Sequence, residues 1–132
     1  MERYYDRIKF LETILDNMPE PIYVLDKRGN FIYVNRAMID LSGASKKTLL
    51  GYDMYQLARE GFIERAVSES VLAEKRQLSF FQDVVSHRGK RYRQLNTVTP
   101  VFDSNGNIEY MVAVLLPMDD LNQRLHTADG TG

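Results

Sequence analysis

The fold is decided by residues Pro21–Gly51, which read PIYVLDKRGNFIYVNRAMIDLSGASKKTLLG. Two segments at its start, Pro21–Asp26 and Phe31–Val34, are rich in the β-branched and aromatic residues that strands favour. The tetrapeptide KRGN between them is typical of a hairpin turn. Asn35 follows directly, and its side chain suits the N-cap of a helix that begins at Arg36. The stretch therefore predicts a β-hairpin that leads straight into a helix.

The remainder of this stretch predicts two short helices. Gly43 is expected to end the first helix, because glycine readily adopts the left-handed conformation that closes helices. Ser45 is the expected N-cap of the second helix, and Gly51 its end.

A longer amphipathic helix is predicted for residues 1–19. Its apolar residues recur three and four positions apart and share one stripe: Tyr4, Ile8, Leu11, Leu15 and Met18. Pro19 ends the helix because it cannot continue the hydrogen-bond ladder. The stripe can pack on the domain's own sheet or on a second copy of the chain. In the second case Ile8, Leu11 and Leu15 are the candidate dimer contacts.

The second half of the chain predicts one helix and three strands. Tyr52–Glu60 has no clear pattern, whereas Phe62–Glu74 places its apolar residues on one helical face. Strands are predicted at Leu78–Ser86, Lys90–Phe102 and Ile108–Leu116, joined by turns that contain glycine. Neither face of the resulting sheet is polar, so both faces must be covered. We expect an α+β fold with the short helices on one face and the N-terminal helix on the other.

Composition excludes several kinds of site. The chain has 132 residues, 44% of them hydrophobic and 27% charged, as expected for one globular domain. A net charge of −1 predicts neither nucleic acid nor membrane as a partner. The absence of cysteine removes disulfides, thiolate catalysis and iron–sulfur ligation. No leader and no apolar run of membrane-spanning length is visible, so we expect a cytoplasmic location.

Four sequence segments, in this order, resemble a PAS domain over Leu11–Asp120: PIYVLDKRGNFIYVNRA, SKKTLLG, SHRGK and TPVFDSNGNIEYMVAV. The segment REGFIERAVSESVLAEKRQLSFFQDV further resembles the PAS domains of sigma-54-dependent transcription activators. The resemblance implies a five-stranded antiparallel sheet around a pocket for flavin, haem or a small organic molecule. It divides the chain into an N-terminal helix (1–19), a PAS sensory domain (20–120), and the start of a linker with a disordered tail (121–132).

The residues argue against two of the family's cofactors. Met54 stands where the flavin photosensors of the family carry their reactive cysteine, so a cysteinyl-flavin adduct is excluded. Phe62–Glu74 has no histidine that could serve as the axial ligand of haem, and His87 belongs to a predicted turn. No catalytic constellation and no metal-ligand spacing is visible, so we expect a small organic ligand, no metal and no enzyme activity.

The same resemblance orients the strands and points one set of side chains at the pocket. The expected ligand-binding residues are Tyr23, Leu25, Phe31, Tyr33, Gln82, Val84, Gln94, Asn96, Val98, Met111, Ala113 and Leu115, with Met38, Leu41, Met54, Leu57 and Val67 as the helical wall. Among them, Tyr33, Gln82, Gln94 and Asn96 are expected to orient a carbonyl or carboxylate. The alternative is a collapsed core in which the amides satisfy one another, the backbone or water.

Together these features predict the sensory domain of a bacterial transcriptional regulator, which binds a small molecule and signals to an effector domain in the same chain. The alternatives are a ligand-free PAS dimerisation module, or the sensor of a histidine kinase or diguanylate cyclase. A homodimer through the N-terminal helix is expected. Pro117-Met118-Asp119 stands where many relatives have Asp-Ile-Thr, so the exit from the last strand is expected to be kinked or decoupled.

Overall fold

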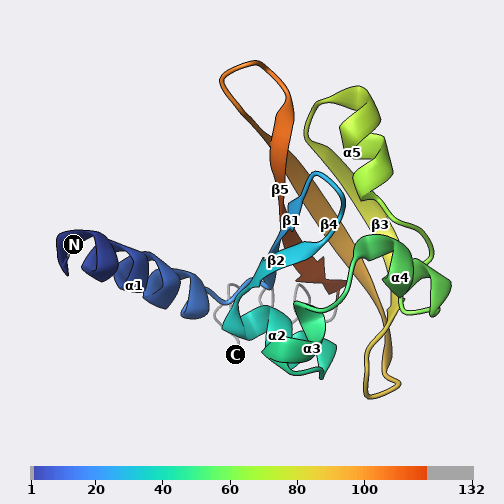
Figure 1. Ribbon diagram of the computed structural model, residues 1–132. Coiled ribbons are helices and arrows are strands. Elements are labelled where there is room, and N and C mark those ends of the chain that lie inside the picture. Colours follow the sequence, from blue (N-terminus) through green and yellow to red (C-terminus); the bar gives the residue numbers. More distant parts are fainter. Residues whose placement is uncertain (1, 119–132) are drawn as a thin grey trace, which may run out of the picture.

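One antiparallel sheet organises the molecule (Figure 1). The computed structural model describes residues 2–118. The helices are α1 (Glu2–Asp16), α2 (Arg36–Ser42), α3 (Lys46–Leu49), α4 (Met54–Arg59) and α5 (Ser68–Glu74). The strands are β1 (Ile22–Asp26), β2 (Phe31–Val34), β3 (Leu78–Val85), β4 (Arg91–Phe102) and β5 (Ile108–Pro117), in the spatial order β2-β1-β5-β4-β3. The predicted α+β class with a five-stranded antiparallel sheet is confirmed.

The core lies between the sheet and the helices α2–α5. Leu25 of β1, Met111 of β5 and Val71 of α5 are all fully buried there. Side chains alternate between the two faces along each strand, so every second one points into the core. The helices form the layer that packs against them. One face of the sheet is therefore fully covered.

Helix α1 does not cover the opposite face, contrary to the sequence prediction. It projects away from the sheet, and its described side chains are exposed except for half-buried Leu15 (Figure 1). The Asn35 amide holds the end of α1 beside α2 by donating to the Leu15 carbonyl at 2.9 Å. Apolar side chains on the uncovered face, including Ile32 and Val114, remain exposed to solvent.

The predicted helix over Phe62–Glu74 is shorter than expected, because its first half pairs with the sheet instead. Val85 donates its backbone N–H to the Phe62 carbonyl at 2.9 Å, and Ile63 forms an antiparallel bridge with Val84. The helical part is α5 alone, from Ser68 onward.

Helix α4 was not predicted from the sequence. It occupies most of the segment Tyr52–Glu60, where no pattern was evident, and Asp53 caps it by accepting from the Gln56 amide at 2.8 Å. The preceding helix α3 ends at Leu49 with Leu50 as its C-cap, so Gly51 follows the helix end rather than forming it.

A β-bulge in the first hairpin reverses one predicted orientation. Tyr23 lies opposite Val34 and Val24 opposite Tyr33, but Leu25 lies opposite Phe31, so the pairing passes over one residue of β2. An extra residue on one strand shifts every later side chain to the other face. Val34 is consequently buried in the core. Tyr33 points away from it and donates from its hydroxyl to the Asp16 carboxylate at 3.3 Å.

The C-terminal strand runs through Pro117, one residue beyond the prediction, and pairs there with Gln94. The predicted linker and disordered tail at 121–132 lie outside the described residues. Of the predicted exit Pro117-Met118-Asp119, Pro117 still belongs to β5 and Met118 is the last described residue, so a kinked or decoupled exit stays a prediction. None of the helices in the described part of the chain has the length and apolar character that a bilayer crossing requires.

Candidate functional site

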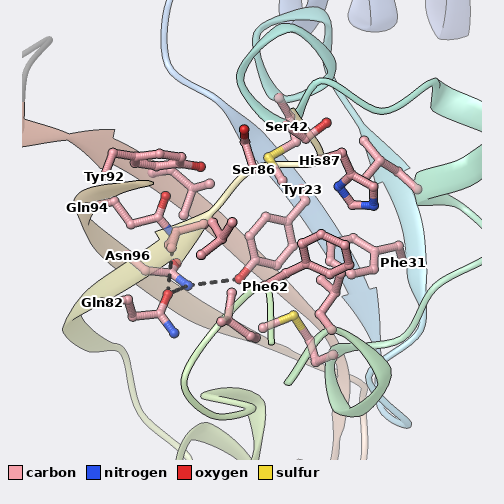
Figure 2. Close-up of a pocket in the computed structure, with 18 residues that line it drawn as sticks. Tyr23, Phe31, Ser42, Phe62, Gln82, Ser86, His87, Tyr92, Gln94 and Asn96 are labelled. Atoms are coloured by element: carbon pink, nitrogen blue, oxygen red, sulfur yellow. Dashed lines mark hydrogen bonds between the residues drawn. The ribbon is translucent and has the colours of Figure 1, made fainter. Parts of the chain in front are cut away.

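A cavity of about 50 Å³ lies between the inner face of the sheet and the helical layer (Figure 2). A single water needs about 10–15 Å³ measured in this way, so there is room for roughly three to five water-sized positions. The lining residues are Tyr23, Phe31, Met38, Ser42, Leu49, Met54, Leu57, Phe62, Ile63, Gln82, Val84, Val85, Ser86, His87, Tyr92, Gln94, Asn96 and Leu115.

Many of the residues that were expected at the pocket do line this cavity. These are Tyr23, Phe31, Met38, Met54, Leu57, Gln82, Val84, Gln94, Asn96 and Leu115. Five others are buried in the apolar core without lining it: Leu25, Val67, Val98, Met111 and Ala113. Half-buried Leu41 packs against that core, and Tyr33 lies outside it because of the bulge. Whether the lining residues bind a ligand remains a prediction.

Three side-chain amides and one phenol form a connected network on the sheet side of the cavity. Gln94 and Asn96 lie two residues apart on β4, so both side chains point to the same face, and Gln82 of β3 lies opposite Gln94. The Gln82 carbonyl oxygen accepts from Gln94 Nε2 at 3.3 Å and from Asn96 Nδ2 at 3.2 Å. Asn96 Nδ2 also donates to the Tyr23 hydroxyl at 2.9 Å. The strand pairing thus brings three amides into one cluster (Figure 2).

The network leaves part of its hydrogen-bonding capacity unused. Gln82 Nε2, Gln94 Oε1 and Asn96 Oδ1 have no hydrogen-bond partner among the described residues. The three side chains are only 4%, 3% and 1% exposed, respectively. Buried polar atoms are almost always paired with protein, water or ligand. Among the residues that line the cavity, these three amide atoms and His87 Nε2 are buried without a hydrogen-bond partner in the described structure.

An aromatic cluster at the cavity was missed by sequence reasoning. His87 stacks on Phe62 with ring centroids 4.1 Å apart and meets the edge of Tyr52 at 5.6 Å. Its backbone N–H donates to the Ser42 carbonyl at 2.8 Å, which ties the β3–β4 turn to the end of α2. The turn sequence around His87 is polar and gave no sign of this contact, because Phe62 was expected to lie in a helix.

The hydroxyls of the cavity stay neutral over the physiological range. Burial raises the pKa of Tyr23 to about 12, against a smaller opposing effect of its hydrogen bond with Asn96. Burial raises the pKa of Tyr92 to about 12 as well. No Lys, Arg, Asp or Glu is among the lining residues. The cavity is therefore polar but carries no carboxylate, ammonium or guanidinium group.

Tyr23 is expected to make the fold sensitive to alkali. Its pKa is about 12 in the folded chain and 10.0 ordinarily, so the unfolded state loses the proton first as pH rises. This contribution is fully present below about pH 10 and falls by about 1.4 kcal/mol per pH unit until the folded pKa is reached. Urea unfolding at about pH 8 and about pH 11 measures the loss.

The Tyr23→Phe variant should lose about 1 kcal/mol at the lower pH, because the Asn96 amide loses one acceptor. It should also lose less stability than the wild type between the two pH values. Tyr110→Phe, on the uncovered face of the sheet, is the matched control and should keep the wild-type difference. An unchanged pH dependence in Tyr23→Phe would contradict the assignment to Tyr23.

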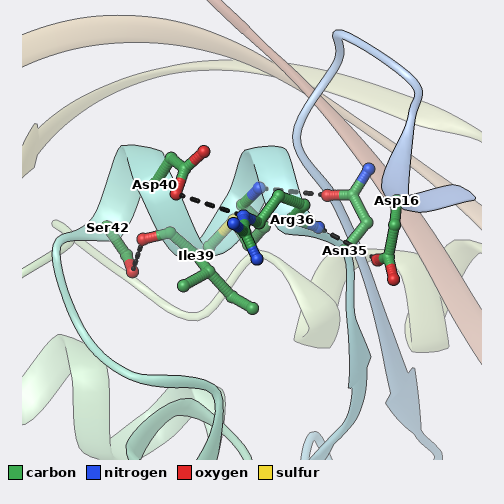
Figure 3. A network of polar contacts seen from close by, with 7 residues as sticks. Asp16, Asn35, Arg36, Ile39, Asp40 and Ser42 are labelled. Atoms are coloured by element: carbon green, nitrogen blue, oxygen red, sulfur yellow. Dashed lines mark hydrogen bonds and ion pairs between the residues drawn. The ribbon is translucent and has the colours of Figure 1, made fainter.

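Asn35 connects three elements of the fold, and Figure 3 shows its contact with α2. Its Oδ1 accepts from the backbone N–H of Met38, as predicted for the N-cap of α2, and also from Ile22 at the start of β1. Its Nδ2 donates to the carbonyls of Leu15 at 2.9 Å and Glu20 at 3.0 Å. One fully buried side chain therefore connects α1, β1 and α2.

No group of three or more metal-ligating side chains occurs within residues 2–118. The segment Phe62–Glu74 contains no histidine, and Met54 lines the cavity from α4. As folded, a cavity of about 50 Å³ is also far smaller than the roughly 300–1,000 Å³ of typical cofactor sites. The absence of haem and flavin therefore stays a prediction.

Comparison with curated proteins finds similarity to sensor proteins. The virulence sensor protein BvgS of Bordetella pertussis is 28% identical over 134 residues, which span 93% of this chain and 11% of that protein. BvgS of Bordetella bronchiseptica is 27% identical over 132 residues, with the same coverage. This chain therefore spans about a tenth of the length of these relatives.

Solved structures share the fold. The PAS domain of Bordetella pertussis BvgS superimposes with a TM-score of 0.71 at 24% identity, covering 98% of this chain and 99% of that one. A PAS domain from a two-component sensor histidine kinase gives a TM-score of 0.69 at 16% identity, with 86% and 98% covered. The family model described as PAS fold matches residues 9–118, nearly the whole described chain. With this sheet, this helical layer and this match, the chain belongs to the PAS family.

Proposed function

We propose that this PAS domain is the signal-input domain of a longer sensor protein, and that a small molecule entering the cavity changes its output. The observation that carries the proposal is the cavity whose lining includes three amide side chains, each with one buried, unpaired atom. An input domain of this kind binds and signals and is not itself an enzyme. Binding would shift the population between two arrangements of sheet and helices, with coupling of about 1–3 kcal/mol.

The relatives favour a sensor protein over the transcriptional regulator that the sequence predicted. Their printed names describe virulence sensors and a two-component sensor histidine kinase. We therefore propose a sensor kinase as the class of the full-length protein, which was the alternative reading of the sequence. A sigma-54-dependent regulator has no support from these relatives.

Native mass spectrometry of the freshly purified chain, followed by denaturing spectra of the same sample, tests the proposed function. A mass excess that disappears on denaturation is the expected result. The variant Leu57→Phe, which fills the cavity from α4, should lose this excess, while Leu50→Phe on the exposed end of α3 should retain it. An apo mass in every sample would instead favour a ligand-free dimerisation module.

A second proposal concerns dimerisation, because α1 leaves its apolar stripe exposed. Tyr4, Ile8 and Leu11 of this stripe are 71%, 39% and 57% exposed, whereas Leu15 is half-buried. Monomeric proteins rarely expose contiguous apolar surface of this kind without a partner. We propose that a second copy of the chain covers it and that the dimer forms through α1.

The variant Leu11→Asp is expected to convert the dimer to a monomer, because the interface would have to bury an unpaired carboxylate. Sedimentation equilibrium measures the change, and the dissociation constant should rise by at least about a hundredfold. Thr13→Asp adds the same charge at a polar, exposed position of α1 and should leave the dimer intact. A monomeric wild type, or equal dissociation in both variants, would contradict the proposal.

A further inference from the structure

The chemistry of the cavity can be derived from its unpaired atoms. Gln82 Nε2 is a donor, whereas Gln94 Oε1 and Asn96 Oδ1 are acceptors. Their orientations are fixed relative to one another, because the Gln82 oxygen already accepts from both of the other amides. The amide network therefore offers one donor group and two acceptor oxygens, and His87 Nε2 is a further buried, unpaired atom of a lining residue.

A fitting ligand must carry the complementary groups. It needs hydrogen-bond donors for Gln94 and Asn96 and an acceptor for the amide of Gln82. A carboxylate fits poorly, because it only accepts and would leave both acceptor oxygens unpaired. It would also bury a negative charge where no Lys or Arg lines the cavity. A ketone likewise supplies an acceptor but no donor.

We propose that the cavity binds a small neutral carboxamide or urea. A primary amide group carries one carbonyl acceptor and two N–H donors, which is the complement of the three unpaired atoms of the amide network. The inference rests on the proposed function and specifies its ligand class. Of the carbonyl or carboxylate that these side chains were expected to orient, it keeps the carbonyl.

The size of the cavity agrees with this chemistry. About 50 Å³ corresponds to roughly three to five water-sized positions, which is the size of acetamide or urea. The remaining walls are mostly apolar, with Met38, Met54 and Leu57 from the helices and Leu115 from β5. They can contact a methyl group while the amide end pairs with the network. Acetamide is therefore a suitable probe.

Three small molecules of similar shape can distinguish whether the cavity prefers an amide, a carboxylate or a ketone. Acetamide, acetate and acetone share an acetyl group. They differ only in the substituent on its carbonyl carbon, which makes them an amide, a carboxylate and a ketone, respectively. Titrations of the ¹⁵N-labelled 132-residue chain are followed by NMR through the side-chain amide signals of Gln82, Gln94 and Asn96. We expect acetamide to bind with a dissociation constant in roughly the millimolar range, given so few atoms. Acetate and acetone should bind at least about tenfold more weakly.

Two matched variants test the role of the network. Gln94→Met keeps the length of the side chain but removes the acceptor Oε1, and it should abolish the preference for acetamide over acetone. Gln77→Met removes an exposed amide that bonds the Thr99 hydroxyl at 2.8 Å, and it should keep the preference. Thermal unfolding of both variants identifies any loss of folding. Should Gln94→Met fail to fold, wild-type selectivity among the three probes still decides.

The outcomes distinguish this inference from the proposed function. Equal or tighter binding of acetate or acetone would overturn the amide class, while leaving a ligand-binding cavity intact. Absence of any shift with all three probes would mean that the network pairs only with water and would overturn the inference. The proposed function itself fails only if native mass spectra also show no ligand in the wild type.

Discussion

Replacing Asn35 with alanine is expected to lower the free energy of unfolding by about 3–5 kcal/mol. The side chain is fully buried and makes four hydrogen bonds to the backbone, two as acceptor and two as donor. Its removal leaves the amides of Ile22 and Met38 and two carbonyls without this partner, and each buried unpaired group costs about 1–3 kcal/mol. Urea unfolding followed by circular dichroism measures the difference.

Ser45→Ala is the matched control for an ordinary helix cap. Ser45 caps α3 by accepting from the Thr48 amide at 3.1 Å, but it is exposed and water can replace it. Its loss should therefore cost about 1 kcal/mol. If the Asn35 and Ser45 variants lost equal stability, Asn35 would be a local cap only and not the connection between α1, β1 and α2.

The Val34→Asn variant is expected to lose about 3–4 kcal/mol of stability, whereas Tyr33→Asn should lose about 1 kcal/mol or less. Val34 is 1% exposed within the core, so asparagine there loses apolar burial and places an amide among apolar side chains. Tyr33 lies on the other face, where its hydroxyl reaches the Asp16 carboxylate and water can solvate a shorter side chain. Thermal and urea unfolding of the two variants give the comparison.

These two adjacent positions test the bulge directly. Strict alternation from the sequence places Tyr33 in the pocket and Val34 outside, so it predicts the opposite order of destabilisation. A larger loss in Tyr33→Asn would mean that β2 pairs with β1 without the extra residue. The ligand-binding role expected for Tyr33 would then return.

Local patterns were sufficient for most of the elements. The first hairpin, the caps at Asn35 and Ser45, and the three later strands all agree with the prediction to within one residue. These features depend on short-range chemistry, namely turn residues, side-chain caps and period-two alternation. The predicted cavity-lining positions are correct where the alternation of side chains along a strand is unbroken, as for Gln94 and Asn96 on β4.

Three of the errors share one cause, which is contact between residues distant in the sequence. Phe62 and Ile63 carry a helical pattern, but pairing with Val84 and Val85 outweighs that weak preference. Helix α4 lacks a clear pattern, and its cap at Asp53 lies beside the hairpin turn, where Asn30 and Asp53 form a bridge. His87 was assigned to a solvated turn because its partner Phe62 had been assigned to a helix.

The sequence by itself determined the order of the elements and the polar character of the strand that faces the cavity, because these depend on local periodicity and turn chemistry. The PAS fold class was indicated by the resemblance of four sequence segments to that family. The tertiary structure alone decided which amide atoms remain unpaired, how large the cavity is and where α1 points. Those properties arise from the pairing of β3 with β4, from the bulge in β2 and from the four hydrogen bonds of Asn35. Each of these joins separate segments of the chain, whose relative positions are set by packing and not by local preference.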